Sequence, residues 1–372
     1  MNPDFRRLPA ALALAAALLA APVAAQLPAP PASAPGPVSA GGYAAVTLRV
    51  SPGDSADSDP ELNEAAAALL LSGTPWRRLS YFAEIEAASV SRETFTGRED
   101  ERWLEVERAY LELAASDALR LRVGRFLTPV GQWNELHAAP LTWTAGRPLT
   151  TYRAFAKSST GAMVAGQFAL GTRDAGYAVW VAPGIGLEGD GEESTFLRAA
   201  GTRAAFELVP GLHVGFSSAG IRASRRTGGP EPEEDGESPD ATRLPADRAR
   251  DPEDDDDRLE DRETRALMGA DLSWTIGGFH LLSEATWLSA SGDAPAERGG
   301  FVEAAVPLAR GLHLVGRAEA YDPVVSGPLR IYTAGLNWRP TSRLALKVER
   351  QATSRPSRRV ADGWLVSLSG LF

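Results

Sequence analysis

Charged side chains recur at every second position within several apolar segments of this 372-residue chain. Arg120 and Arg122 alternate with leucine and valine, and Lys347 stands between Leu346 and Val348. An alternation with a period of two places one set of residues on each face of a β-strand. Charges that share one face of a membrane-crossing strand must contact water or pair with each other, because an unpaired charge in hydrocarbon is costly.

The parity of this alternation predicts which charged side chains line the inner face of a closed sheet. The predicted lining comprises Arg49, Arg108, Arg120, Arg122, Arg203, Arg265, Arg317, Lys347, Glu84, Glu86, Glu112, Glu207, Asp271, Glu284, Glu303, Glu319 and Glu349. Eight of these residues are positive and nine are negative, so the lining is balanced. A balanced lining suits a water-filled pore, and the alternative is a lumen plugged by ion pairs that does not conduct.

The long connection over residues 127–160 has an unusual composition. It carries one carboxylate, Glu135, against four side chains that are or can become cationic: Arg147, Arg153, Lys157 and His137. It also contains more aromatic residues than a merely solvated loop needs: Trp133, Trp143, Tyr152 and Phe155. We expect the loop to fold inward, so that its basic residues form the pore constriction and give a mild anion preference. The alternative is a loop that caps the outer mouth.

Three histidines follow short turns in the same pattern, each as the second residue after its turn: His213, His280 and His313. We expect them at one height, as a partial ring at the periplasmic end that is neutral near pH 7 and cationic in acid. On alternate strands they would lie roughly 10 Å apart, given a strand spacing of about 4.8 Å. Hydrated histidines are therefore expected, and no metal site is predicted.

The chain contains no motif of a known catalytic or cofactor chemistry. It has no phosphate-cradling glycine loop, no zinc-binding helix motif and no Rossmann turn. Cysteine is absent, which excludes disulfides, thiolate chemistry and cysteine-ligated metals. We therefore predict a protein that is not an enzyme, needs no cofactor and does not bind nucleic acid.

From Gly42 onward the chain is a succession of alternating segments separated by turns. Short turns such as Pro210-Gly211 and Gly277-Gly278 alternate with longer links, which is typical of membrane β-barrels. Residues 62–72 are helical by composition, but only a strand there keeps every long link on one side and closes the sheet. An open edge in lipid leaves backbone groups unpaired. We predict an all-β fold, a transmembrane antiparallel β-barrel of sixteen strands with short periplasmic turns and long extracellular loops.

The two ends of the chain indicate export to a bacterial outer membrane. Residues 1–25 have the arginines, the short apolar run and the small-residue cleavage site of a signal peptide. A Pro/Ala-rich segment over 26–41 precedes the barrel, which is expected over 42–372. Phe372 ends an amphipathic strand, and this pattern resembles the sorting signature that the assembly machinery of outer-membrane barrels reads. The expected partners are this machinery, outer-membrane lipid with lipopolysaccharide, and small solutes or ions, for either a monomer or a homotrimer.

The acidity of the chain belongs to one segment. The net charge is −10, and residues 230–262 alone hold fifteen acidic and five basic residues. The segment contains several prolines and has no apolar periodicity, so a disordered acidic loop is predicted over 224–262 at the outer surface. Its spacing fits no calcium loop, and solvated charge is favoured over weak Ca²⁺ or Mg²⁺ binding.

The stretch Leu119–Trp133, LRLRVGRFLTPVGQW, followed by Asn134-Glu135, resembles the strand-five and third-loop region of the phosphate-selective porin family. The resemblance implies a sixteen-stranded barrel with an inward-folded third loop. The phosphate site of that family uses a lysine-rich constriction, whereas this chain has two lysines, so phosphate specificity is not carried over. The expected function is passive diffusion of small hydrophilic solutes or ions. The alternative is a closed outer-membrane barrel with a structural, receptor or adhesion role.

Overall fold

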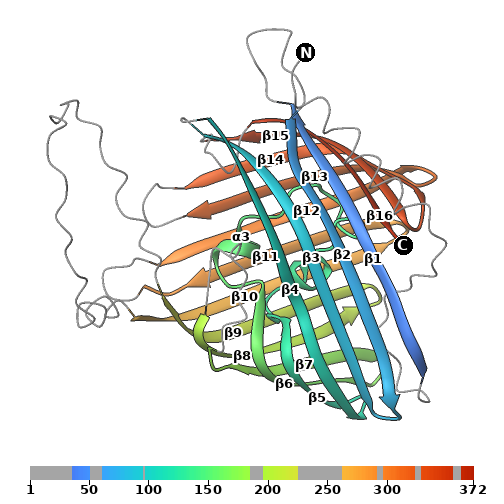
Figure 1. Ribbon diagram of the computed structural model, residues 1–372, viewed down its shortest axis with the longest axis vertical. Coiled ribbons are helices and arrows are strands. Elements are labelled where there is room, and N and C mark those ends of the chain that lie inside the picture. The colour runs from blue at the N-terminus through green and yellow to red at the C-terminus, as the bar shows by residue number, and fades with distance from the viewer. Residues whose placement is uncertain are drawn as a thin grey trace, which may run out of the picture.

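The described residues form one closed antiparallel β-barrel (Figure 1). The computed structural model describes residues 36–50, 61–94, 97–184, 196–224, 262–290, 296–322, 328–354 and 362–372. Each strand pairs with its neighbours in the chain, and the first strand pairs with the last. The predicted fold class and the count of sixteen strands are confirmed.

The bounds of the sixteen strands and of two short helices define where the connections lie. The strands are β1 (Gly36–Val50), β2 (Glu61–Trp76), β3 (Leu79–Thr94), β4 (Gly97–Ser116), β5 (Leu119–Leu127), β6 (Ser158–Leu170), β7 (Arg173–Ala182), β8 (Phe196–Val209), β9 (Leu212–Ser224), β10 (Arg262–Ile276), β11 (Phe279–Leu288), β12 (Glu297–Ala309), β13 (Leu312–Asp322), β14 (Leu329–Thr341), β15 (Leu344–Thr353) and β16 (Gly363–Leu371). The helices α2 (Trp133–Leu136) and α3 (Thr150–Arg153) both lie between β5 and β6.

The segment that is helical by composition is the strand β2, which pairs with β1 and β3. Closure of the sheet outweighs the helix propensity of its alanines and leucines, because β1 would otherwise lack a partner on that edge. The strand β1 begins at Gly36, before the expected start at Gly42. The signal peptide expected over 1–25 lies outside the described residues, as does most of the acidic loop, residues 225–261.

Tight turns connect the strands at one end of the barrel. Gly211 and Gly311 have positive φ angles of 77° and 73° in two of these turns. A Cβ on either residue would lie 2.3 Å from a backbone carbonyl oxygen of the next hairpin, that of Thr275 or Arg339. Glycine is therefore required at both positions, for its backbone freedom and for the close approach of the neighbouring turn.

The seam between β1 and β16 closes the sheet with the last residue of the chain. Gly42 and Phe372 exchange two backbone hydrogen bonds of 3.0 Å. Further along the seam, Thr47 donates to Ser367 on the inner face at 3.0 Å. The role of Phe372 in recognition by the assembly machinery stays a prediction.

The two faces of the barrel differ in chemistry as the alternation indicates. Large apolar side chains such as Leu121, Val302 and Trp338 are exposed on the outer face. The inner face is polar on β15 and β16, where Glu349 and Ser367 are buried. No helix among the described residues is long and apolar enough to cross a membrane.

The largest apolar cluster of the described residues lies on the inner face of β6 to β11. Phe155, from the segment between β5 and β6, is buried there with Trp180 of β7. The other members of the cluster are Phe126, Val130, Ala154, Ala156, Met163, Ala178, Ala182, Ala199, Ala219, Ile221, Leu267 and Leu288. Burial of this patch favours an inward position of the segment, since apolar area removed from water contributes roughly 25 cal/mol per Å².

The outer belt predicts a depth-dependent penalty for introduced charge. Val302 lies midway along β12 and is 50% exposed, whereas Leu308 is exposed next to the turn. In a bilayer, Val302→Arg should destabilise the barrel by about 2–4 kcal/mol and Leu308→Arg by about 0–1 kcal/mol. Urea unfolding in lipid vesicles, followed by tryptophan fluorescence, measures both. Equal losses at the two positions would contradict a lipid-facing belt.

Candidate functional site

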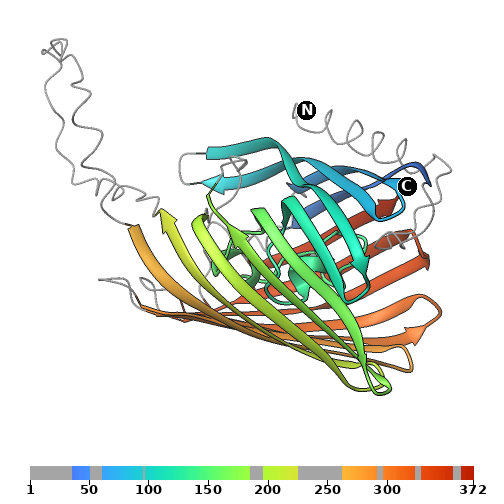
Figure 2. The same cartoon turned by 90° about the horizontal axis from the view of Figure 1, so that it is seen from below.

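The segment between β5 and β6, residues 128–157, lies inside the barrel. Figure 2 shows this segment, with α2 and α3, between the strands at the start of the chain and those of its second half. Its polar groups contact side chains of five consecutive strands, β11 to β15. We name this segment the inner loop and the inner faces of β11 to β15 the docking wall.

Carboxylates of the docking wall accept hydrogen bonds from backbone N–H groups of the inner loop. Glu284 accepts from Gln132 at 2.6 Å and from Trp133, Glu319 accepts from Leu149 at 2.9 Å, and Glu349 accepts from Ala145 at 3.0 Å and Gly146 at 3.4 Å. Hydrogen bonds with an ionised partner contribute about twice as much as neutral ones. These carboxylates therefore fix the path of the loop through its main chain, whatever its side chains are.

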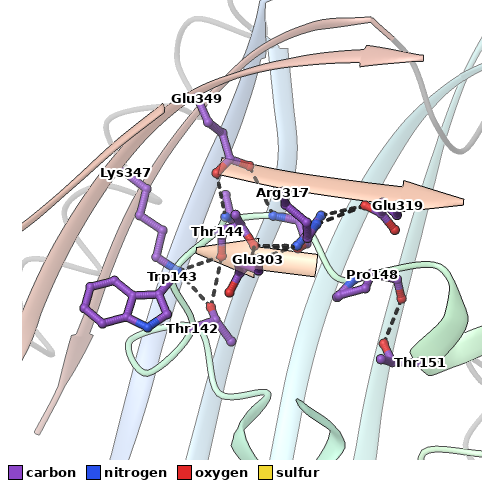
Figure 3. A network of polar contacts seen from close by, with 12 residues as sticks. Thr142, Trp143, Thr144, Pro148, Thr151, Glu303, Arg317, Glu319, Lys347 and Glu349 are labelled. Atoms are coloured by element: carbon purple, nitrogen blue, oxygen red, sulfur yellow. Dashed lines mark hydrogen bonds and ion pairs between the residues drawn. The ribbon is translucent and has the colours of Figure 1, made fainter. Parts of the chain in front are cut away.

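Cations of the docking wall donate to oxygen atoms of the inner loop. The Lys347 ammonium donates to the carbonyl oxygens of Ala139 at 2.8 Å and Thr144 at 2.9 Å, and to the hydroxyl of Thr142 at 2.8 Å (Figure 3). All three donor positions of the ammonium are thus used. The Lys347 side chain is 1% exposed, so these three oxygens replace the water that it would otherwise bind.

Two further wall residues bind the loop carbonyls next to this site. Arg339 donates to the carbonyl oxygens of Leu141 and Thr142 at 3.1 and 3.0 Å. Asn337 donates to the carbonyl oxygen of Trp143 at 2.8 Å. Most carbonyl groups of residues 138–146 that face the docking wall therefore accept a hydrogen bond from it, as buried backbone groups require.

Arg317 connects the wall carboxylates to the loop. Its guanidinium lies 3.0 Å from Glu319 and 3.4 Å from Glu303, and it donates to the carbonyl oxygen of Gly146 at 2.7 Å (Figure 3). Thr144 donates in turn to Glu303 at 2.7 Å. Because Arg317 is 1% exposed, its loss would leave buried carboxylates without a counter-charge, a change that costs about 3–5 kcal/mol in other proteins.

The wall on the other side of the barrel, β3 to β5, carries three arginines that remain accessible. Arg108 pairs with Glu84 at 2.5 Å, and Arg122 and Arg120 share Glu112 at 2.6 and 3.9 Å. The arginine side chains are 20%, 24% and 22% exposed, whereas those of Glu84 and Glu112 are 0% and 8% exposed. The charge that solvent meets on this wall is therefore more positive than the sum of the formal charges of its side chains. We name these three residues the arginine strip.

Aromatic rings hold two members of the arginine strip against the wall. Phe82 and Tyr110 stack with their ring centroids 5.6 Å apart. The Arg108 guanidinium lies 4.6 Å from the Phe82 centroid, and that of Arg122 lies 4.1 Å from the Tyr110 centroid. Such cation–π contacts are attractive, by about 0.5–1 kcal/mol at exposed sites. They restrict the guanidinium groups without removing their charge.

Three of the basic residues predicted to form the constriction are paired, either within the inner loop or with glutamates of β3 and β4. Arg147 donates to Asn134 at 3.3 Å and to two oxygens of Thr151, all within the inner loop. Lys157 lies 3.1 Å from Glu107 and 3.4 Å from Glu86, and His137 lies 2.5 Å from Glu107. The side chain of Arg153 lies outside the described residues. Their role as the constriction stays a prediction.

Two of the three predicted ring histidines contact the inner loop. His280 and His313 each lie 4.7 Å from the Trp143 ring and 6.4 Å from one another, between centroids. His213 is exposed on β9. Among the remaining predicted lining residues, Arg203 pairs with Asp271 at 2.5 Å and Arg265 with Glu297 at 2.6 Å. Arg49 donates to Asn63 at 3.1 Å, and Glu207 accepts from the backbone N–H of Gly211 at 3.0 Å.

The loop threonines, Asn337 and Arg339 are not among the predicted site residues. The alternation that places Lys347 inside also places these two residues inside, between Leu336 and Pro340, so parity would have found them. Thr142 and Thr144 have no such signal. Their importance depends on which wall the loop contacts, and that is set by long-range packing.

Comparisons with known proteins agree on the fold. No protein-family model and no curated protein matches the chain. Among solved structures, OmpF of Salmonella typhi, in complex with daunomycin, is similar with a TM-score of 0.58 and 10% identity over 90% of this chain and 97% of that one. An anion-selective porin from Comamonas acidovorans is similar with a TM-score of 0.56 and 13% identity over 90% and 99%. The outer-membrane channel DcaP of Acinetobacter baumannii gives 0.52 and 10% over 90% and 97%. The chain therefore has the fold of the outer-membrane porins.

The contacts of Lys347 predict that its removal loosens the inner loop. Lys347→Met removes one donor from three loop oxygens and leaves the Thr142 hydroxyl as the one donor shared by the Ala139 and Thr144 carbonyls. Each buried group left unpaired costs about 1–3 kcal/mol. Hydrogen–deuterium exchange of residues 138–149 should become faster, because the docked state opens more often. Arg343→Met, at an exposed position before the same strand, is the control. Unchanged exchange in Lys347→Met would contradict its role as an anchor.

Proposed function

We propose that the protein is an outer-membrane channel for passive diffusion of small hydrophilic solutes or ions, with a mild preference for anions. The outer apolar belt and the closed hydrogen-bond ladder support a place in a lipid bilayer. The similar solved structures are porins and outer-membrane channels, which supports the class of function.

The observation that carries the proposal is that the inner loop buries the charges of the docking wall but not those of the arginine strip on the opposite wall. On the docking wall, the Arg317 side chain and Lys347 are each 1% exposed, because the inner loop covers them. On the opposite wall, the arginine strip is accessible, although it also points into the barrel. On the facing wall, His137 and Lys157 of the loop reach Glu107 and Glu86, but the arginine strip stays partly exposed. A loop that leaves such a strip uncovered narrows a pore without closing it.

The anion preference is supported by the burial of the carboxylates in that strip. Glu84 and Glu112 lie behind the guanidinium groups, and Glu112 serves two arginines. A permeating ion therefore meets cations first, and the charge at a narrow place sets ion selectivity. The predicted constriction consists of Arg147, Arg153, Lys157 and His137, and its two arginines and its lysine add to this positive charge in the proposal. Phosphate specificity is not part of it.

Further expectations accompany this proposal. The chain would be inserted by the barrel assembly machinery through Phe372, lie among outer-membrane lipid and lipopolysaccharide, and act as a monomer or a homotrimer. The alternative is a closed barrel with a structural, receptor or adhesion role, in which ion pairs and the inner loop fill the lumen. Discrete conductance steps of the purified protein in planar bilayers favour the channel, and their absence favours the closed barrel.

The arginine strip predicts the sign of the ion selectivity. In a potassium chloride gradient, the reversal potential of the wild-type protein should show that chloride permeates more readily than potassium. Replacing both Arg120 and Arg122 with glutamine should bring the permeability ratio towards one, because it removes both cations and leaves Glu112 unpaired. Arg298→Gln is the control, since Arg298 is 76% exposed and pairs with Asp322 away from the strip.

Two results would contradict this assignment. A cation preference of the wild-type protein would exclude the proposed selectivity altogether. If the wild type prefers anions and the double variant keeps the same permeability ratio, residues other than the arginine strip determine the selectivity.

A further inference from the structure

A second polar cluster lies where the inner loop passes the wall of β3 and β4. Glu84 of β3, Glu107 of β4 and His137 of the inner loop each bring one candidate ligand atom to within 4.8 Å of the others. Both carboxylates are fully buried, and the His137 ring is 7% exposed. The three residues belong to separate segments, so no spacing motif in the sequence joins them.

Each residue of the cluster has a buried polar atom that forms no hydrogen bond of normal geometry, although those of Glu107 and His137 lie in ion pairs. These atoms are Glu84 Oε1, Glu107 Oε1 and Oε2, and His137 Nε2. The second oxygen of Glu84 is occupied by Arg108, and Oε2 of Glu107 lies in an ion pair with Lys157 at 3.1 Å. Buried polar atoms without a partner are rare in folded proteins and call for an explanation, such as a bound ion.

The surroundings of His137 restrict that explanation. Its Nδ1 lies 2.8 Å from the carbonyl oxygen of Asn134, which accepts a hydrogen bond only if Nδ1 carries the proton. Its Nε2 then has a free lone pair, and it lies 2.5 Å from Glu107 Oε1, which has lone pairs as well. Two acceptors at this distance need a cation, either a second proton on the ring or a metal ion.

Glu84 distinguishes these two possibilities. A proton on Nε2 satisfies His137 and Glu107 but leaves Glu84 Oε1 buried without a partner. A metal ion coordinated by one atom from each residue satisfies all three. The backbone carbonyl that binds Nδ1–H is also the usual support of a metal-binding histidine, because it fixes the tautomer and aims Nε2 at the metal.

We propose that Glu84, Glu107 and His137 form a binding site for a divalent first-row transition-metal ion, with Zn²⁺ as the representative. One imidazole and two carboxylates suit Zn²⁺, whereas Ca²⁺ and Mg²⁺ prefer ligand sets made of oxygen alone. With bonds of about 2.0–2.2 Å, two ligands of a tetrahedral ion lie roughly 3.3–3.6 Å apart. On binding, His137 Nε2 and Glu107 Oε1 would therefore separate from 2.5 Å, and Glu84 would approach them from within 4.8 Å. The bound ion would tie the inner loop to β3 and β4, on the side away from the docking wall.

Equilibrium dialysis of the full chain, folded in detergent micelles, against Zn²⁺ tests the proposal. The wild-type protein should bind one Zn²⁺ ion, and His137→Gln should bind it at least about tenfold more weakly. Even the loss of a residue that only supports a metal ligand lowers metal affinity by about that factor. His213→Gln is the matched control, because His213 is exposed on β9 and lies outside the cluster. Equal binding by the wild type and His137→Gln, or no binding by either, would overturn the site.

A second variant tests the same site by a gain of affinity. The Lys157 ammonium lies 3.1 Å from Glu107 and repels a metal ion there. Lys157→Met should therefore bind Zn²⁺ more tightly than the wild type, whereas unchanged or weaker binding would overturn the proposal. This variant decides the matter if His137→Gln fails to fold. Neither measurement uses conductance, so the site can fail while the channel function stands, and the reverse.

Discussion

The burial of charge on one inner wall is the constraint on which the rest of the structure depends. Arg317, Lys347 and Glu349 are almost completely withdrawn from water, and buried charges are tolerated only with partners that replace their hydration. The inner loop supplies those partners mostly through its backbone. Loop and wall therefore require each other: without the loop the wall would need water, and without the wall the loop would carry unpaired N–H and carbonyl groups.

This mutual requirement makes the lumen asymmetric. The loop leaves β5 and brings His137 and Lys157 close to β3 and β4. Its Phe155 packs in the apolar cluster of β6 to β11, and its Trp143 contacts His280 of β11 and His313 of β13. Because the polar groups of the loop bind β11 to β15, the arginine strip on β4 and β5 keeps its access to water. The same interaction thus determines where the inner loop lies and which wall of the lumen stays exposed to water.

Much of the fold follows from the sequence. Alternation fixes which face of a strand each residue occupies, and closure of the barrel leaves few possible strand counts. Parity places Lys347 and Glu349 inside, and closure makes residues 62–72 a strand despite their helical composition. The docking partners of the loop follow no such rule. Whether a lumenal glutamate pairs with a neighbouring arginine, as Glu112 does, or with a loop N–H, as Glu284 does, depends on contacts between residues far apart in the chain. Nor does spacing reveal the proximity of Glu84, Glu107 and His137.

The central claim, that the wall opposite the docked loop lines a water-filled passage, is tested most directly by thiol labelling. The chain has no cysteine, so Arg122→Cys and its outward-facing neighbour Leu121→Cys each introduce a single thiol. In planar bilayers, a charged methanethiosulfonate reagent should change the single-channel conductance of Arg122→Cys and leave that of Leu121→Cys unchanged. An unreactive Arg122→Cys, or an equal response of both variants, would contradict the account.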